Sequence, residues 1–439
     1  MKFYIKTFGC QMNEHDSEII AGLLLKDGYE ETSVIDNADI IIANTCCIRE
    51  SAENKIWGFI GNIKNYKYKN PNVILAVLGC MTQQKSIQDT INKMGRYIDI
   101  VLGTYQQHRL PEYISRVLAG SGQIIDISQD NNDFPDILPV CRTDKYRAQV
   151  NIIYGCNNFC SYCIVPYVRG RERSRDFNAI VNEVKDLAAD GCKEITLLGQ
   201  NVNSYGKDRQ DNDWSFAKLL VELDKIDGIE RIRYMSSHPR DFSLDLVDTI
   251  ATLPKVCSHF HLPLQSGCDK TLKAMNRGYD TAKYKAIIDR IREKVPNAAV
   301  TTDIIVGFPG ETEEDFQKSL DFVKECKFDS AFTFLYSKRS GTVAAKNPDQ
   351  VSEAVKKERL QRLLDVQNAN SLQINNDLVN KIIKVLVEGV SKTSAGTYTG
   401  RSAGNKVVVF PGGPELVGKI VDVKIDEAKT WHLAGKVIG

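Results

Sequence analysis

The stretch YGCNNFCSYCIVPY, residues 154–167, decides the fold of the largest part of this chain. Its three cysteines, Cys156, Cys160 and Cys163, follow the pattern C-x3-C-x2-C and come directly after the strand-like run QVNIIYG (149–155). Thiolates at this spacing can surround one face of a compact iron–sulfur cluster. Three ligands on a four-iron cluster leave one iron open for catalysis. A loop after a barrel strand is also where barrel enzymes carry their active sites.

Structural zinc is the alternative for this loop. A structural zinc site is closed by four ligands, and no histidine or further cysteine lies within 14 residues on either side of the three. The chain holds twelve cysteines, and in a reducing compartment such a number indicates metal binding or catalysis before disulfides. We therefore expect an iron–sulfur cluster in this loop.

The loop belongs to a larger region, residues 142–373, in which strand and helix patterns alternate. The six strand patterns are QVNIIYG (149–155), EITLLGQ (194–200), RIRYMSS (231–237), FHLPL (260–264), VTTDIIVGF (300–308) and SAFTFLY (330–336). Helical patterns such as ETEEDFQKSLDFVKEC separate them. Six strand–helix units predict a partial or complete (β/α) barrel rather than an open sheet.

Residues 1–118 show shorter strand–helix units. Continuous apolar strands alternate with amphipathic helices, which predicts a parallel, flavodoxin-like sheet covered on both faces. In the helix predicted over 14–28, Ile19, Ile20, Leu23 and Leu24 share one face, and Gly28 suits its end. Turn residues and acidic character after this region predict a linker over 119–141.

A second set of cysteines follows three strands of the N-terminal region. Cys10, Cys46 and Cys80 are separated by 35 and 33 residues, yet each comes at the end of a strand pattern. The carboxyl ends of parallel strands meet at one edge of the sheet, where open α/β sheets bind ligands, so the three should converge. Unrelated buried cysteines are the alternative, and the repeated offset argues against it. Cys47 is a poorer ligand candidate because Cys46 already occupies the equivalent position.

Residues 375–438 carry five short strand patterns with glycine turns, which predict a small OB-like β-barrel. This stretch is locally basic, with nine Lys or Arg against six Asp or Glu. The formal net charge of the whole chain is only +1, so any binding of nucleic acid must come from local patches.

Length and composition indicate a soluble globular protein. The chain has 439 residues, enough for two or three domains, with 42% hydrophobic and 26% charged residues. No apolar run approaches the roughly 18 residues that a membrane span needs, and the N-terminus enters a strand pattern without a secretion signal. We expect a cytoplasmic protein.

With Tyr162 before its last cysteine, the C-x3-C-x2-C loop resembles that of the radical S-adenosylmethionine (SAM) superfamily. The resemblance implies a 4Fe–4S cluster whose open iron binds SAM and cleaves it reductively to a carbon radical. Cys10, Cys46 and Cys80 resemble the set that holds a second 4Fe–4S cluster in the methylthiotransferase family, and the C-terminal segment looks like that family's RNA-binding TRAM domain. The resemblance covers nearly the whole chain.

Local motifs resemble the MiaB branch of this family. They are FGCQMNEHDSE around Cys10, NTCCIRESAENKIWG around Cys46 and YMSSHPRDF around His238. The branch acting on threonylcarbamoyl adenosine typically has Lys-Val-Asn after the first cysteine, whereas Gln-Met-Asn stands here. The implied reaction converts N(6)-dimethylallyladenosine beside the tRNA anticodon to its 2-methylthio derivative. One SAM would methylate sulfur on the second cluster, and another would supply the radical that attacks the base.

Several strand-end residues are candidates for SAM contacts by this resemblance, with simple strand-end capping as the alternative. They are Tyr162, Gly199, Gln200, Asn201, Ser236, Gln265 and Asp303. GFPGET (307–312) looks like the superfamily's later-strand SAM motif, although alone it is only a glycine turn before a helix.

RNA-contact candidates lie in two places. Arg169, Arg171, Arg173 and Arg175 follow the cluster loop and could meet RNA phosphate or the SAM carboxylate. Tyr398, Arg401 and Lys406 combine aromatic and basic character on the small barrel, as single-strand binding surfaces do, although Tyr398 could instead be core. A solvated basic face is the alternative for both groups.

The implied partners are a tRNA anticodon stem-loop, an external electron donor and an external sulfur donor, and we expect a monomer. Two other functions stay open at this point. One is methylthiolation of threonylcarbamoyl adenosine, and the other is a non-enzymatic, metal-containing RNA-binding protein.

Overall fold

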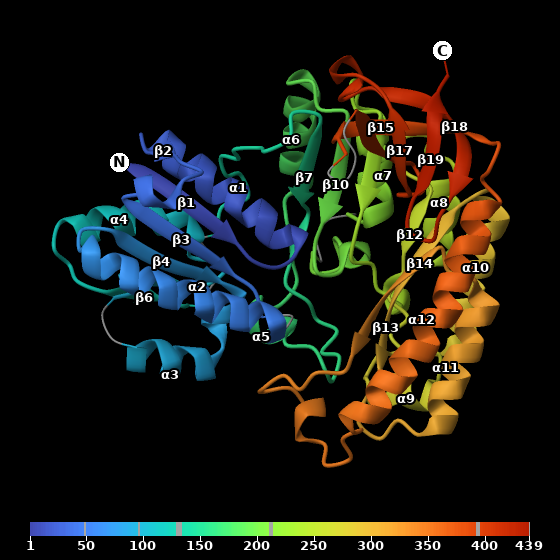
Figure 1. Ribbon diagram of the computed structural model, residues 1–439, viewed down its shortest axis with the longest axis horizontal. Coiled ribbons are helices and arrows are strands. Elements are labelled where there is room, and N and C mark those ends of the chain that lie inside the picture. The colour runs from blue at the N-terminus through green and yellow to red at the C-terminus, as the bar shows by residue number, and fades with distance from the viewer. Residues whose placement is uncertain (48–49, 95–96, 129–133, 210–213, 392–395, 439) are drawn as a thin grey trace.

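The computed structural model describes the whole chain except residues 48–49, 95–96, 129–133, 210–213, 392–395 and 439. Figure 1 shows an N-terminal α/β layer in blue, a central strand–helix region from green to orange, and a small C-terminal barrel in red. These three parts confirm the predicted fold class. Among the described helices, none combines the length and apolar character needed to cross a bilayer.

The N-terminal part is a six-stranded, fully parallel sheet with the order β2-β1-β3-β4-β5-β6. Its strands are β1 (Lys2–Thr7), β2 (Glu30–Glu31), β3 (Ile40–Thr45), β4 (Ile74–Gly79), β5 (Ile100–Leu102) and β6 (Ile124–Asp126). Alternate residues of β3 enter two separate cores, because helices cover both faces: Ile40 and Ile42 face one core, Ile41 and Ala43 the other.

Four helices cover this sheet: α1 (Gln11–Lys26), α2 (Glu50–Lys69), α3 (Lys85–Met94) and α4 (Leu110–Leu118). Helix α1 ends as Gly28 predicts. With φ of +87°, Gly28 lets its own N–H reach the Leu25 carbonyl and that of Tyr29 reach the Leu24 carbonyl.

The segment predicted as a linker contributes β6, which pairs with β5 at the edge of the sheet. Only Ile124 of this strand is buried. A strand of three residues with one buried side chain has no readable period, so its pattern resembles a loop.

The central part is a partial barrel of six parallel strands. The strands are β7 (Arg147–Asn151), β10 (Glu194–Leu198), β11 (Arg231–Tyr234), β12 (His259–His261), β13 (Ala299–Val306) and β14 (Ser330–Leu335). They form two three-stranded sheets, β11-β10-β7 and β12-β13-β14. Ile232 of β11 forms a parallel bridge with Val256, three residues before β12, so β12 comes next to β11 in chain order.

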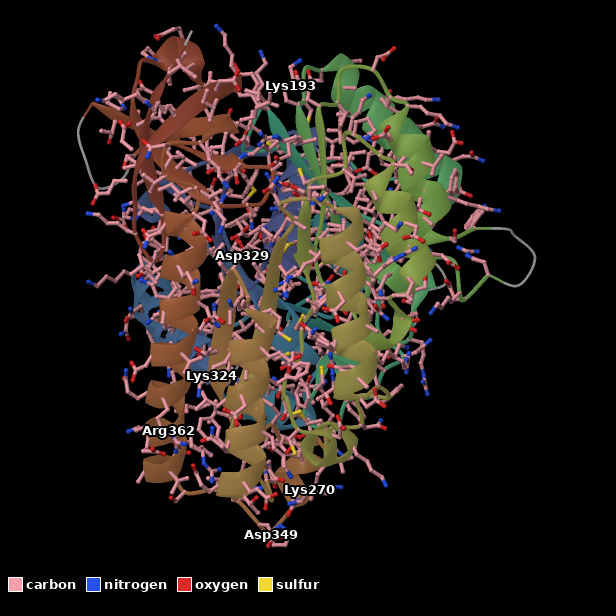
Figure 2. The ribbon with its side chains drawn as sticks, turned by 90° about the vertical axis from the view of Figure 1, so that its right-hand side faces the viewer. Lys193, Lys270, Lys324, Asp329, Asp349 and Arg362 are labelled. Carbon is pink, nitrogen blue, oxygen red and sulfur yellow. The ribbon has the colours of Figure 1, made fainter. Side chains whose placement is uncertain are left out.

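Helices pack against the outer face of these strands. They are α6 (Phe177–Ala189), α7 (Phe216–Asp224), α8 (Leu244–Ala251), α9 (Asp269–Ala274), α10 (Thr281–Lys294), α11 (Glu313–Cys326) and α12 (Glu353–Asn376). Side chains such as Ile195, Leu219 and Ile287 fill the core between strands and helices. Figure 2 views this helical layer, with Lys324 on α11 and Arg362 on α12.

The C-terminal part is a closed barrel with the strand order β15-β16-β17-β19-β18. Its strands are β15 (Ile382–Val390), β16 (Thr397–Ser402), β17 (Val407–Pro411), β18 (Ile420–Ala428) and β19 (Leu433–Val437). It lies against the amino ends of the central strands. Arg233 donates to the Ser402 and Ala403 carbonyls at 2.7 and 3.0 Å, and Arg231 to that of Arg401 at 2.7 Å. The carboxyl ends therefore stay free for the N-terminal layer.

Candidate metal centres between the sheet and the barrel

The first cysteine trio lies in one loop, between β8 (Ile153–Tyr154) and α5 (Val165–Val168). The loop turns on itself, since the N–H of Cys163 donates to the Cys160 carbonyl at 2.9 Å and that of Cys156 to the Gly170 carbonyl at 3.1 Å. Burial, with Cys160 as a neighbouring charge, raises the pKa of Cys163 to about 12. The three thiols thus share one pocket in which a thiolate needs a compensating cation.

Two buried side chains beside this trio were not predicted as site residues. Arg277 donates from Nη1 to Cys160 Sγ and to the Tyr162 hydroxyl, both at 3.3 Å. His238 Nε2 lies 3.9 Å from Cys160 Sγ. Burial and then the Arg277 charge lower the pKa of His238 well below its usual range, which keeps this imidazole neutral. No sequence motif marks Arg277 as a site residue. What identifies it is that this charged side chain is almost fully buried, and the burial can be seen only in the folded structure.

The predicted SAM-contact residues gather around the carboxyl ends of the barrel strands. Ser236 and Gln265 both have left-handed backbone, with φ of 65° and 68°, in the segments two residues after β11 and four residues after β12. Such strain in residues other than glycine is concentrated at functional sites. The buried Gln265 Oε1 and Asn201 Oδ1 have no hydrogen-bond partner among the described residues. These oxygens are available to a bound molecule.

The remaining candidates have other surroundings. Gly199 allows β8 to pack closely against it, because a Cβ at this position would lie 2.4 Å from Ile153 Cγ2. Gln200 accepts a hydrogen bond from the Gly155 N–H and so holds the cysteine loop. Tyr162 packs beside Met275 and Phe308.

We predicted that Asp303 ends its strand. The structure shows that it lies inside β13 instead. It is level with Gln265, whose N–H donates to the Asp303 carbonyl at 2.7 Å, because β13 extends beyond its neighbour β12. Its carboxylate lies 3.5 Å from His261 Nε2. The apolar pattern of the sequence does not show that β12 stops before β13 does, so it could not place Asp303 within its strand.

The second trio is assembled at the carboxyl edge of the N-terminal sheet. Cys10 caps the start of α1, and Cys46 and Cys80 come directly after β3 and β4. Gly9 has a φ of +121°, and a Cβ there would lie 2.8 Å from Cys46 Sγ, so only glycine permits this approach. The buried Asn13 side chain donates to the carbonyls of Phe8 and Thr45, both at 2.8 Å. The strand ends are thereby tied together.

Cys47 lies in the same pocket as this trio. It is 1% exposed and packs with Cys80, Ile164 and Val168. A hydrogen bond from Cys47, with the charge of Arg169, lowers the pKa of Cys80 to about 6 despite burial. Cys80 is therefore prepared to be a thiolate before any metal binds.

The four arginines after the cluster loop have different surroundings. Arg169 is buried, and its guanidinium donates to Cys80 Sγ at 3.0 Å and to Asp16 at 2.7 Å. Arg173 pairs with Asp136 at 3.1 Å, and Arg175 with Glu183 at 2.8 Å. Three of the four predicted RNA contacts are thus engaged by the protein itself. Arg171 is exposed, stacks on the Phe159 ring at 4.3 Å, and stays a candidate.

The residues predicted to contact RNA on the small barrel also interact with other parts of the protein. Tyr398 is 8% exposed and belongs to the barrel core. Lys406 pairs with Asp329 at 2.6 Å, where the small barrel meets the helical layer (Figure 2). These side chains are used in packing and in joining two parts of the chain, and their contact with RNA stays a prediction. Arg401 also pairs with Glu388 at 3.3 Å, but 38% of its side chain is exposed.

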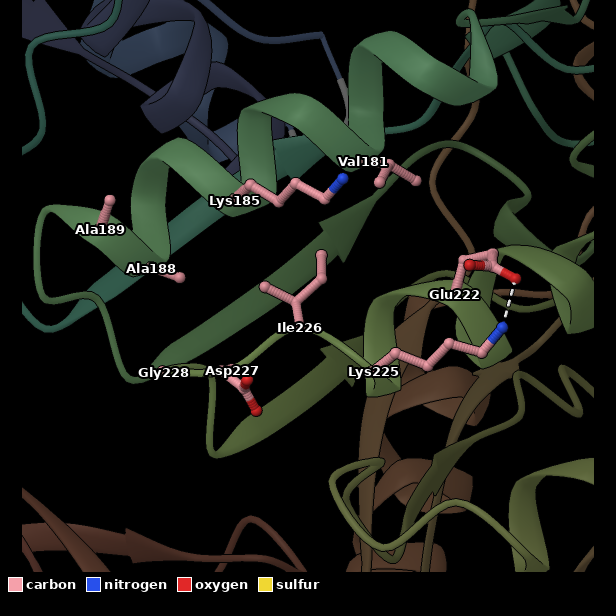
Figure 3. Close-up of a pocket in the computed structure, with 9 residues that line it drawn as sticks. All are labelled: Val181, Lys185, Ala188, Ala189, Glu222, Lys225, Ile226, Asp227 and Gly228. Carbon is pink, nitrogen blue, oxygen red and sulfur yellow. Dashed lines mark hydrogen bonds and ion pairs between the residues drawn. The ribbon is translucent and has the colours of Figure 1, made fainter.

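One surface hollow is lined by none of the cysteines. Figure 3 shows a cavity of about 640 Å³ between α6 and α7, lined by Val181, Lys185 and Ile226 among others. Lys225 and Glu222 pair at its rim at 2.6 Å. In the described part of the chain, no three His, Cys, Asp or Glu side chains form a group that could hold a single metal ion. A four-iron cluster spans more space than one ion, so the loops, burial and donors around each trio are the test of fit.

Comparisons with known proteins match all three parts. A model of the radical SAM superfamily matches residues 150–323, one of the uncharacterized protein family UPF0004 matches 2–103, and one of the TRAM domain matches 377–438. The tRNA-2-methylthio-N(6)-dimethylallyladenosine synthase of Thermoanaerobacter pseudethanolicus is 52% identical over 436 residues, covering 99% of this chain and 92% of its own. That of Alkaliphilus oremlandii is 52% identical over 437 residues, covering 100% and 93%.

Solved structures of lower identity share the fold. The radical SAM methyltransferase TsrM of Kitasatospora setae matches 90% of this chain and 79% of its own, with a TM-score of 0.58 and 12% identity. The cobalamin-dependent radical SAM enzyme OxsB matches 84% and 55%, with a TM-score of 0.53 and 10% identity. At these identities the likeness concerns architecture alone.

Proposed function

The chain belongs to the family of tRNA-2-methylthio-N(6)-dimethylallyladenosine synthases, and from this membership we propose how its residues divide the work. The enzyme converts N(6)-dimethylallyladenosine in tRNA to its 2-methylthio derivative by radical SAM chemistry. The observation that carries this conclusion is the 52% identity over 436 residues, which spans the radical SAM core and both flanking parts.

Cys156, Cys160 and Cys163 are the proposed ligands of the SAM-binding 4Fe–4S cluster. Their buried, shared pocket fits a group that compensates thiolate charge, and Arg277 donates to Cys160. When bound, cluster and SAM supply a carbon radical, which can remove the unactivated hydrogen of adenine carbon-2 where acid–base chemistry cannot. The unpartnered oxygens of Gln265 and Asn201 are proposed to accept hydrogen bonds from SAM.

Cys10, Cys46 and Cys80 are the proposed ligands of an auxiliary 4Fe–4S cluster that handles the inserted sulfur. Three observations support this set: each cysteine follows a strand at one edge of the sheet, Gly9 and Asn13 hold the loops together, and the pKa of Cys80 is lowered. Cys47 is proposed as a neighbour that hydrogen-bonds to Cys80 and not as a ligand, because Cys46 comes first after β3.

The proposed partner is the anticodon stem-loop of tRNA, since bases of a loop can be turned out of the stack and received in a pocket. The electron donor and the sulfur donor are proposed to be external. Arg171 is proposed to contact RNA phosphate, as it is exposed and lies eight residues after Cys163, the last thiol of the cluster loop.

The RNA contact is tested by measuring tRNA affinity at several salt concentrations. Arg171→Ala should weaken binding by about threefold and reduce the salt dependence by about one phosphate contact. Arg116→Ala, which removes an exposed arginine from α4, is the matched control and should leave both unchanged. An unaltered salt slope in Arg171→Ala would remove Arg171 from the RNA surface.

The reaction is tested by mass spectrometry of tRNA nucleosides from a deletion strain. We expect the 2-methylthio derivative of dimethylallyladenosine to disappear and unmodified dimethylallyladenosine to accumulate. Return of the derivative on expression of this chain completes the test. Loss of the methylthio form of threonylcarbamoyl adenosine instead would assign the chain to the other tRNA branch, and no change in either nucleoside would refute the function.

A further inference from the structure

A short segment after the barrel cysteines enters the N-terminal part of the molecule. Directly after Cys163, Ile164 and Val168 pack against Cys47 and Cys80. Thr104 Oγ1 donates to the Val168 carbonyl at 3.1 Å, and the Tyr105 hydroxyl donates to that of Arg169. The loop that carries one trio therefore forms part of the wall around the other trio.

Arg169 is the polar end of this segment. Its Nε donates to Cys80 Sγ at 3.0 Å, and its Nη2 donates to Asn13 Oδ1 at 2.8 Å and to Asp16 Oδ2 at 2.7 Å. The Arg169 and Asp16 side chains are 8% and 3% exposed. Asn13 in turn holds the carbonyls of Phe8 and Thr45, so one guanidinium is connected to the loops that carry all three cysteines.

A purely structural role explains this arrangement poorly. Burying an ion pair rarely gains stability over apolar residues of similar size, because desolvation offsets the attraction between the charges. Of the guanidinium nitrogens of Arg169, only Nη2 donates to Asp16, whereas Nε donates to the sulfur of Cys80. A hydrogen bond and a positive charge beside a cluster sulfur favour the reduced state, which carries more negative charge.

We propose that Arg169 is a positioning residue for the auxiliary cluster: it hydrogen-bonds to the ligand Cys80 across the boundary between the two parts and raises that cluster's reduction potential. Because it comes from the loop of the SAM-binding cluster, it also fixes the two sites relative to each other. This inference rests on the proposed auxiliary cluster.

The test uses the full chain with Cys156, Cys160 and Cys163 replaced by Ala, so that only the auxiliary cluster can form. After anaerobic reconstitution, iron content and an electron paramagnetic resonance redox titration are measured for this parent and for Arg169→Gln, Arg169→Lys and the exposed control Arg116→Gln. We expect about four irons in each. The midpoint should shift to lower potential in Arg169→Gln, shift less in Arg169→Lys, which restores the charge, and match the parent in Arg116→Gln.

The possible results separate the two proposals. A parent that binds no cluster refutes the auxiliary cluster and the role of Arg169 with it. A parent with a cluster whose midpoint is the same in Arg169→Gln refutes Arg169 alone. If Arg169→Gln loses iron, Arg169→Lys decides the question. A cluster retained in Arg169→Lys at lower potential supports the proposal. The proposal is overturned by a cluster retained there at the parent's potential, or by loss of the cluster from both variants together with altered circular dichroism.

Discussion

The two cysteine trios reach similar surroundings by different routes. Cys156, Cys160 and Cys163 stand on one loop of eight residues, whereas Cys10, Cys46 and Cys80 come from three loops over 71 residues. The first trio needs only a local turn beside one barrel strand. The second exists only when β1, β3 and β4 pair in the observed order. Three thiols can thus be brought together by local spacing or by sheet topology.

Each trio has a buried arginine that donates to one of its sulfurs. Arg277 reaches Cys160 at 3.3 Å from within the barrel, while Arg169 reaches Cys80 at 3.0 Å from outside the sheet. The barrel trio is therefore complete within its own part, and the sheet trio is completed by its neighbour. Damage to the barrel loop should affect both sites, and damage to the sheet edge should affect one.

The largest expected effect separates the trios by their products. Cys160→Ala should abolish formation of 5′-deoxyadenosine from SAM and all methylthiolation. Cys80→Ala should abolish methylthiolation but keep cleavage of SAM to 5′-deoxyadenosine, because the SAM-binding trio is intact. Each variant should hold about four irons instead of about eight. Chromatography of the nucleosides with an iron assay measures both, and loss of SAM cleavage in Cys80→Ala would contradict the division of roles.

Two glycines allow each loop to be disturbed without touching a thiol. Gly79 has a φ of +103°, and a Cβ there would lie 2.4 Å from the Thr45 carbonyl oxygen. Gly155 has a φ of +74°, and a Cβ there would lie 2.0 Å from the Arg171 carbonyl oxygen. Alanine at either should cost about 2–3 kcal/mol of unfolding free energy. Gly79→Ala should lose auxiliary iron first, whereas Gly155→Ala should weaken both sites, since its loop leads to Arg169.

Gly28→Ala is the control for these glycine variants. Gly28 also has positive φ, but a Cβ there meets nothing within 4 Å. The cost should be only about 1 kcal/mol in urea unfolding, with full iron content. Iron loss in this variant would mean that the clusters report general stability and do not distinguish the loops.

The smallest effect concerns the opposite end of the barrel, away from both trios. Burial, with the charges of His261, Arg233, Arg401 and Lys406, lowers the pKa of His259 well below its usual range. The unfolded chain takes up a proton near pH 6.5 that the folded chain does not, so stability falls as the pH drops below that value. From pH 7 to 5.5 this amounts to about 1 kcal/mol, which His259→Gln should remove.

Urea unfolding at both pH values, with the iron of each sample assayed beforehand, makes this measurement. The parent should lose more unfolding free energy than His259→Gln between pH 7 and 5.5, with equal iron content in the two. Equal pH slopes would show that His259 takes up its proton in the folded chain as well.

The sequence determined the architecture and named the two cysteine trios as candidate ligands, because both depend on spacing along the chain. A C-x3-C-x2-C loop keeps its thiols close in any fold that preserves the turn, and alternating apolar strands and helices specify a parallel sheet and a barrel. Even the distant trio was predictable, because every parallel strand delivers its next residue to the same edge.

Only the tertiary structure decided what the arginines and the strand-level residues do. Arg169 and Arg171 are two residues apart in one basic run, yet the first is buried against Cys80 and the second is exposed. Lys406 joins Asp329, and Asp303 lies inside its strand. Charge along a chain does not reveal whether a long side chain meets water or a buried partner. That depends on which distant surface packs over it, and this packing leaves no period in the sequence.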